Sequence, residues 1–351
     1  MPILGSWAEA IGDSLREQLR PEFGGLNRQL AIGNNMNRGV HRFALLVAGA
    51  TFFLIIAGAL VTSHDAGLAT SDWPLTEGRF LPKVESLGIR TGVNMVGNLF
   101  WEHGHRMVAT TVGVLTIGLV VFLVKKEKRS WVRRLGWIAL AGVIAQGLLG
   151  GLTVKLNLPL VVSAAHATLA QLFFCTTVSL AVFTSSSWIK DRSVIEEQGS
   201  LPLRYLCVAA ASAIFLQLII GATLRHSATW DQPLPTDLLL THIGGAIAVT
   251  FLLGSAALVI LRRHSGESFL TRPAKVALSL LALQLFLGIA AYITRVASPN
   301  DPQPLNPMVG ITVAHVACGA LVFATTIVLT LRAFKVLRSS APSFEFATVE
   351  R

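Results

Sequence analysis

The sequence predicts an all-α integral membrane protein with eight transmembrane helices. Hydrophobic residues make up 52% of the chain and charged residues only 14%, whereas an ordinary soluble domain carries about a quarter charged residues. The mean hydropathy of +0.61 agrees with a membrane protein. Apolar stretches of about 20 residues, long enough to cross a bilayer, occur eight times. They are 43–62, 104–124, 132–154, 160–184, 205–224, 238–261, 274–294 and 308–331.

The net charge of +10 reflects how the chain crosses the membrane. Of the 29 Lys and Arg, 22 lie in the two terminal segments and in the loops that follow spans two, four and six. By the positive-inside rule these segments are cytoplasmic. Both termini are therefore expected in the cytoplasm, and a bacterial inner membrane is the expected location. Membrane lipid is an expected partner, and nucleic acid is not.

The two halves of the chain repeat one pattern. Spans one and five end FFLIIAGALVTSH and FLQLIIGATLRHS, and spans three and seven contain AQGLLGGLTV and LQLFLGIAAYIT. Four spans per half give both copies the same orientation, related by an axis along the membrane normal. We therefore expect two tandem, parallel-repeat four-helix bundles with cytoplasmic flanking segments. The bundles are 43–184 and 205–331, the linker is 185–204, and the flanking segments are 1–42, with a candidate interfacial helix, and 332–351.

Four of the nine histidines occupy matched positions, each opening an even-numbered span after an outer loop. They are His105, His166, His242 and His315. Two imidazoles that face each other across a bundle core are what a haem iron needs for axial ligation. The four histidines therefore predict two haem sites. A histidine near a helix end can also be an ordinary hydrogen-bonded side chain, but the matched placement favours ligation. Copper or zinc also binds imidazole, but thiolate or carboxylate partners at matching depth are absent from the sequence.

Other residues near these positions leave two interpretations open. Neighbouring glycines either admit a flat macrocycle or serve close helix packing. His64 and His226 follow the ends of spans one and five, where they contact a propionate or face water. The neighbouring glycines are Gly150, Gly151, Gly244, Gly245 and Gly319.

The first half carries an acid and a base that the second half lacks. Glu102 and Arg106 lie in WEHGHRMVA, and the matched positions of the second half hold Leu239 and Ile243. Glu102 and His105 are three residues apart, so a helix places them on one face. The carboxylate then lies beside the presumed iron site, where it suits proton transfer. The alternatives are a structural Glu–Arg pair and an interfacial anchor.

Taken together, these motifs resemble those of haem A synthases. The resemblance rests on the E-x-x-H-R pattern at 102–106, on GALVTSHDAGLATSDWP at 58–74, and on the span openings HATLAQ, THIGGA and HVACGA. It covers roughly residues 43–331. Such a resemblance implies an eight-span oxidoreductase that oxidises a methyl group of haem O to a formyl group. The product would be the haem A of terminal oxidases.

The resemblance also implies roles for single residues. His105 and His166 would ligate the iron of the substrate haem O and product haem A, and His242 and His315 would ligate the iron of a b-type haem (haem b). Glu102 would be the catalytic carboxylate, with Arg106 as its charge partner. The haem sites would lie toward the outer face.

The resemblance further implies partners and shows one departure. A haem O synthase and oxidase assembly factors are expected partners, while the electron acceptor and homo-oligomer formation stay open. Many members carry a cysteine pair in the outer loops, where this chain has Thr70 and Thr76. This departure questions a thiol-dependent step more than the overall activity. The segment Asp72–Pro74 forms either a lid over the haem or a plain turn.

Two other classes of protein explain part of the pattern. A non-catalytic di-haem b-type electron-transfer cytochrome needs the four histidines, but it has no use for a carboxylate confined to one half. A transporter built from parallel repeats explains the duplication, but it leaves the matched histidines without a role. The presence of Glu102 in one half alone favours the enzyme.

Overall fold

The computed structural model describes residues 38–76, 78–79, 97–190, 194–197, 203–227, 234–296 and 306–339. Eight helices in this part of the chain are long and apolar enough to cross a membrane, which confirms the predicted spans. The first runs from Arg38 to Ser63. The others are α2 (Asn98–Lys126), α3 (Ser130–Lys155), α4 (Leu160–Thr184), α6 (Leu203–Ser227), α7 (Thr236–Arg263), α8 (Ser268–Val296) and α9 (Asn306–Val336). The candidate interfacial helix of the N-terminal segment lies outside the described residues.

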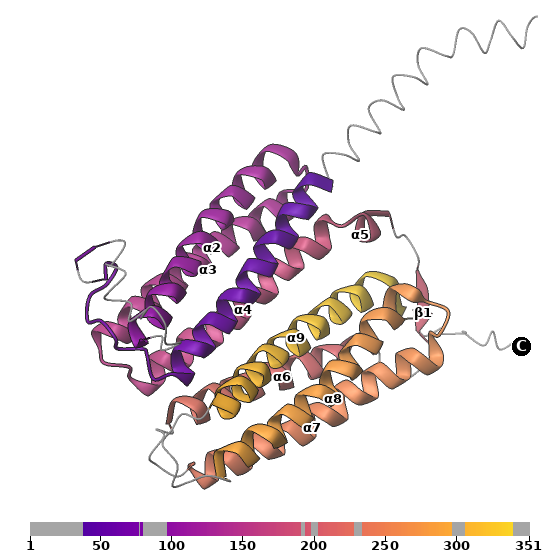
Figure 1. The fold of residues 1–351 in the computed structure, drawn as a ribbon. Coiled ribbons are helices and arrows are strands. Elements are labelled where there is room, and N and C mark those ends of the chain that lie inside the picture. The colour runs from indigo at the N-terminus through magenta and orange to yellow at the C-terminus, as the bar shows by residue number, and fades with distance from the viewer. Residues whose placement is uncertain are drawn as a thin grey trace, which may run out of the picture.

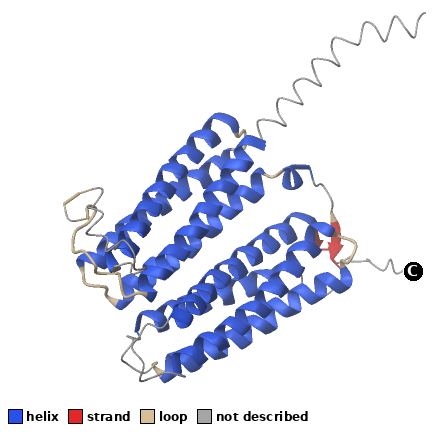
Figure 2. Ribbon diagram, in the orientation of Figure 1, coloured by secondary structure: helices blue, strands red, loops and turns tan. Residues whose placement is uncertain are grey.

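The spanning helices lie in two groups, as Figure 1 shows. The first helix and α2, α3 and α4 lie side by side, and so do α6, α7, α8 and α9. The groups meet where α4 contacts α6 and α9. The short helix α5 (Ser186–Lys190) and strand β1 (Ile195–Glu197) lie at one end of the helices, and the turn between α3 and α4 lies at the other. Figure 2 shows how completely helices dominate the molecule.

Helices form here because hydrocarbon offers no partner for backbone N–H and C=O groups, so every group must be satisfied within its own segment. Large apolar side chains such as Ile247, Phe251 and Phe286 are 67–72% exposed and thus face lipid. Polar side chains inside the helices bond back to their own backbone. The hydroxyl of buried Thr116, for example, donates to the carbonyl of Val112 at 2.7 Å.

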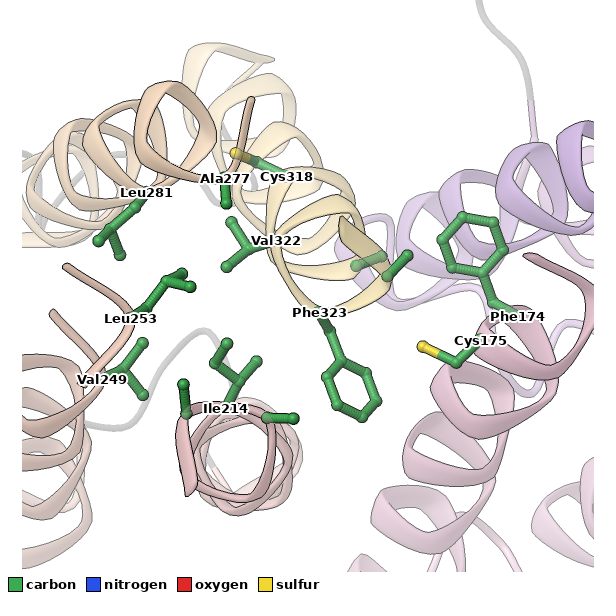
Figure 3. Packing of buried hydrophobic residues seen from close by; sticks show 14 of the residues in the cluster. Phe174, Cys175, Ile214, Val249, Leu253, Ala277, Leu281, Cys318, Val322 and Phe323 are labelled. Carbon is green, nitrogen blue, oxygen red and sulfur yellow. The ribbon is translucent and has the colours of Figure 1, made fainter. Parts of the chain in front are cut away.

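A buried apolar cluster holds the two groups together (Figure 3). In the close-up, Ile214 of α6, Leu253 of α7 and Val322 of α9 point into a common space, while Phe323 of α9 points toward Cys175 of α4. Cys175 is buried in this cluster. All three cysteines of the chain are buried free thiols, as expected for packing residues.

A two-stranded parallel sheet, which the sequence did not predict, ties the linker to the C-terminal segment. Helix α9 continues to Val336, beyond the predicted end of the span, and β2 (Leu337–Ser339) follows directly. Ile195 of β1 pairs with Leu337 of β2, and the Leu337 side chain is fully buried. Three residues are too few to show the alternating pattern of a strand. The sheet lies at the C-terminal end of α9, whereas His315 lies near the N-terminal end of that helix.

Candidate functional site

Each of the four matched histidines packs against a glycine of the preceding spanning helix. A Cβ added at the glycine would lie only 3.0–3.1 Å from the histidine Cε1, closer than ordinary contact. The missing side chain therefore makes room for the imidazole between the helices. The pairs are His105 with Gly58, His166 with Gly150, His242 with Gly221, and His315 with Gly288.

Glutamines of α3 and α6 contact two of these histidines. The Gln146 amide donates to the backbone carbonyl of His166 at 2.9 Å, and its Nε2 lies 3.5 Å from the His166 Nε2. The Gln217 amide donates to the carbonyl of His242 at 2.7 Å, and its Nε2 lies 3.0 Å from the His242 Nδ1. Each amide therefore fixes both the backbone and the ring of its histidine.

Among the described residues, no glutamine is shown bonding to the backbone of His315 or His105. The Gln284 Nε2 of α8 lies 3.3 Å from the His315 Nε2. In the first helix, Leu54 stands four residues before Gly58, at the position that glutamine takes in the other three helices. The helix that contacts His105 accordingly carries a leucine at the position where the other helices carry a glutamine.

The histidine pairs fit a haem iron. The rings of His242 and His315 have centroids 6.4 Å apart. A bond between a metal and an imidazole nitrogen is about 2 Å long, so two axial imidazoles place their ring centres roughly 6 Å apart. His105 and His166 occupy the matched positions in the first half of the chain.

Unsatisfied nitrogens point to the same ligand. The Nδ1 atoms of His105, His166 and His315 are buried and have no hydrogen-bond partner among the described residues. Buried polar atoms are normally paired, so these nitrogens are suited to a group that the protein chain does not supply. Within the described ranges, no cluster of three or more His, Cys, Asp or Glu could hold a bare metal ion. Paired imidazoles fit a haem better than a structural zinc site, which needs four ligands.

Glu102 and Arg106 form the ion pair that the sequence left open. Glu102 is only 3% exposed, and its Oε1 pairs with the Arg106 guanidinium. Its Oε2 accepts a hydrogen bond from the backbone N–H of Thr70 at 3.0 Å. Arg106 also donates to the carbonyls of Asp72 and Leu75, each at 2.8 Å. Both carboxylate oxygens are thus held in place, one turn before His105 along α2.

These contacts attach the segment from His64 to Arg79, which we call the first loop, to the start of α2. The buried Thr76 hydroxyl lies 3.1 Å from the His103 Nδ1, so His103 helps to hold the first loop against α2. Thr70 and Thr76 thus hold Glu102 and His103 in place.

Aromatic contacts attach the first loop to its neighbours. The Trp73 ring lies against Gly151 of α3, and the His64 ring stacks on Trp101 of α2 at 4.3 Å. Burial lowers the pKa of His64 below its ordinary value. The Asp72–Pro74 segment is therefore part of a loop that covers the start of α2 and reaches α3.

The two helix groups also meet close to the histidines. The Arg225 guanidinium of α6 donates to the Ser63 hydroxyl of the first helix at 2.7 Å. Ser63 lies five residues after Gly58, which contacts His105, in the same helix, so the end of α6 lies near the first histidine pair. His226, which the sequence placed beyond the end of its span, lies within the last turn of α6. The helix continues further than its apolar stretch, which explains the difference.

The sequence alone identified only part of this packing. Of the five glycines named from it, only Gly150 contacts one of the four histidines, while Gly151, Gly245 and Gly319 lie against Trp73, Gln217 and Gln284. An added Cβ at Gly244 would meet no atom of the described residues within 4 Å. One sequence signal was available and overlooked. Gln-x-x-x-Gly recurs in three odd-numbered spans, as Gln146–Gly150, Gln217–Gly221 and Gln284–Gly288.

A profile of the cytochrome oxidase assembly protein family matches residues 42–232, more than half of the chain. The chain belongs to this family. The stretch that matches the cytochrome oxidase assembly protein family includes Glu102, His105, Arg106 and His166.

This family member is similar to several curated heme A synthases. The heme A synthase of Beijerinckia indica is 43% identical over 131 residues, which make up 36% of this chain and 36% of that relative. The chain thus matches about a third of that protein's length. The heme A synthase of Bacillus licheniformis is 23% identical over 280 residues, 74% of this chain and 88% of the relative. The heme A synthase of Rhizorhabdus wittichii is 25% identical over 329 residues, which make up 80% of this chain and 90% of that relative.

Proposed function

We propose that this protein is a haem A synthase that oxidises a methyl group of haem O to a formyl group. One observation carries the proposal. A buried Glu102–Arg106 ion pair lies one turn from His105 in the first half of the chain, and the second half has no such pair beside its histidines. The curated relatives named heme A synthase support it. An electron-transfer cytochrome would need the histidines but not this carboxylate.

In this proposal the histidines bind two haems. His105 and His166 hold the substrate haem O, and His242 and His315 hold a haem b. The 6.4 Å separation of the second pair supports its assignment. Haem b, when bound, supplies a one-electron carrier near the substrate.

Glu102 is the proposed proton acceptor. The methyl group is hydroxylated in successive steps, in which water supplies the oxygen and a one-electron acceptor takes the electrons, and the resulting diol loses water to leave the aldehyde. Each hydroxylation then releases protons, which must leave the reacting edge. The Thr70 N–H and Arg106 hold the Glu102 carboxylate one turn from His105. Arg106 acts as its charge partner, and a fixed carboxylate near the reacting carbon suits general-base catalysis.

The architecture and its orientation belong to the same proposal. Residues 43–184 form a substrate bundle and residues 205–331 a haem b bundle, two copies of one four-helix repeat in a bacterial inner membrane. Both termini are cytoplasmic, and the haem sites lie toward the outer face. The four repeated histidine–glycine contacts support the repeat, and the distribution of Lys and Arg supports the orientation. A haem O synthase supplies the substrate, and oxidase assembly factors receive the product.

The test is to identify the haems that the protein carries. The full chain is expressed together with a source of haem O and purified, and the extracted haems are separated and identified by mass spectrometry. Haem A, or its hydroxylated precursor, together with haem B is the expected result. Haem B alone, in cells that contain haem O, would instead indicate an electron-transfer cytochrome, and the complete absence of haem would refute both.

A further inference from the structure

Three buried acceptor atoms next to the histidines have no partner. They are the Oε1 atoms of Gln146, Gln217 and Gln284, and no described residue donates to them. Leaving a buried acceptor unsatisfied costs about 1–3 kcal/mol. In each of these glutamines, Oε1 shares one planar amide with an Nε2 that lies 3.0–3.5 Å from a histidine ring nitrogen. The free acceptor is therefore always close to an imidazole.

A histidine that ligates a metal needs such an acceptor. A neutral imidazole that binds iron through one nitrogen carries its proton on the other, and that N–H is held by a carboxylate, a carbonyl or a water. The hydrogen bond fixes the ring and strengthens the ligand. In this structure Nε2 of each glutamine faces the ring nitrogen, and turning the amide over would place Oε1, a carbonyl-type acceptor, where this bond forms.

His105 lacks this support. Its ring packs on Gly58 as the other three rings pack on their glycines, but Leu54 replaces the glutamine one turn earlier. The Leu54 side chain is partly buried and packs against the apolar core.

We propose that Gln146, Gln217 and Gln284 are positioning residues that strengthen their histidines as haem ligands, and that Leu54 makes His105 the exchangeable ligand. The inference rests on the proposed function, because it takes the four histidines as ligands. It gives the substrate haem one strong and one weak ligand, and haem b two strong ones. The weak ligand lies on α2 beside Glu102, so the coordination position that it releases opens near the proposed proton acceptor.

Carbon monoxide binding tests this asymmetry, since the gas binds ferrous haem only after an axial ligand leaves. The purified full-length protein, loaded with both haems, is reduced and mixed with carbon monoxide, and the absorbance change is followed in time. We expect one haem to react and the other to resist. Leu54→Gln should slow the reaction by about tenfold or more, because a hydrogen bond to a ligating histidine changes metal affinity by about 10–100-fold.

Matched variants in the other positions give the opposite result. Gln217→Leu and Gln284→Leu should each make the resistant haem react with carbon monoxide, and Gln217→Glu, which keeps an acceptor, should restore resistance. Gln146→Leu should speed the reaction of the substrate haem by loosening its second ligand. If Leu54→Gln fails to load haem, the faster reaction of Gln146→Leu with carbon monoxide tests the inference in its place. Equal reaction of both haems in the wild type, or rates unaffected by these substitutions, would overturn the inference.

Haem extraction separates this outcome from failure of the proposed function. A protein that carries haem A and haem B but reacts equally at both irons retains the proposed function and refutes only the role of the glutamines and Leu54. A protein without haem refutes the function first.

Discussion

The guanidinium of Arg106 pairs with the carboxylate of Glu102, and the same arginine binds two carbonyls of the first loop. This one side chain therefore connects the acid to the loop that covers the start of α2. An ion pair at this depth costs desolvation energy unless its remaining hydrogen bonds are satisfied. The Thr70 N–H, Asp72 carbonyl and Leu75 carbonyl satisfy them here.

Removing the carboxylate should separate chemistry from haem binding. We expect Glu102→Gln and Glu102→Ala to lower haem A formation by about a hundredfold or more, the usual effect of losing a general base, while haem b is retained. Extracted haems and the visible spectrum measure both quantities. Glu127→Gln is the control, since Glu127 pairs with Arg129 at 2.8 Å at the other end of α2. A Glu102 variant that still makes haem A would remove this residue from the mechanism.

Filling one glycine should displace one haem ligand. A methyl group at Gly221 would lie 3.0 Å from the His242 Cε1, so Gly221→Ala should lower the haem b content about tenfold by pushing the ring aside. Gly244→Ala is the matched control on α7, because an added Cβ there meets nothing nearby among the described residues. His242→Ala should also lose the haem b absorbance. Unchanged spectra in both variants would contradict the assignment of this pair.

The first loop should loosen in acid. Burial lowers the pKa of His64, so the docked loop favours the neutral ring, and its stability is present above the ordinary pKa of about 6.5. Stability is lost as the pH falls below this value through the lowered pKa of the docked state. Fluorescence of Trp101, which stacks on His64, should change over this range. The change should disappear in His64→Phe, and persistence in that variant would exclude His64 as its source.

The proposed orientation can be checked with single cysteines. The three natural cysteines are buried, so background labelling by a membrane-impermeant maleimide should be low. Leu156→Cys, in the exposed turn between α3 and α4, should react in intact cells. Ser265→Cys, in the exposed turn between α7 and α8, should react only after the membrane is opened. The reverse pattern would invert the topology.

The spans were predictable because each depends on local properties of the chain. About 20 apolar residues cross a bilayer whatever their neighbours are, so all eight helices follow from composition. The helix ends were less predictable. The final turn of α6, with His226, and the extension of α9 to Val336 contain polar residues, which an apolar scan excludes.

The candidate site also has contacts that the sequence made predictable and contacts that it did not. The four-residue spacing of Glu102 and Arg106 allowed the two side chains to pair, and the structure shows that they do. Thr70 and Thr76 looked like mere replacements for cysteine, yet they bind Glu102 and His103 across 32 and 27 residues of sequence. No local pattern encodes contacts over such separations.

The sequence by itself determined that this chain forms eight membrane helices, that four histidines recur at matched positions, and that one half alone carries the Glu102 acid. Only the tertiary structure decided which glycine each histidine packs against, which glutamine each one meets, and that Leu54 leaves His105 without such a partner. The reason is physical. Hydropathy acts along one helix, whereas hydrogen bonds and close contacts between helices depend on how neighbouring helices are rotated and aligned against each other.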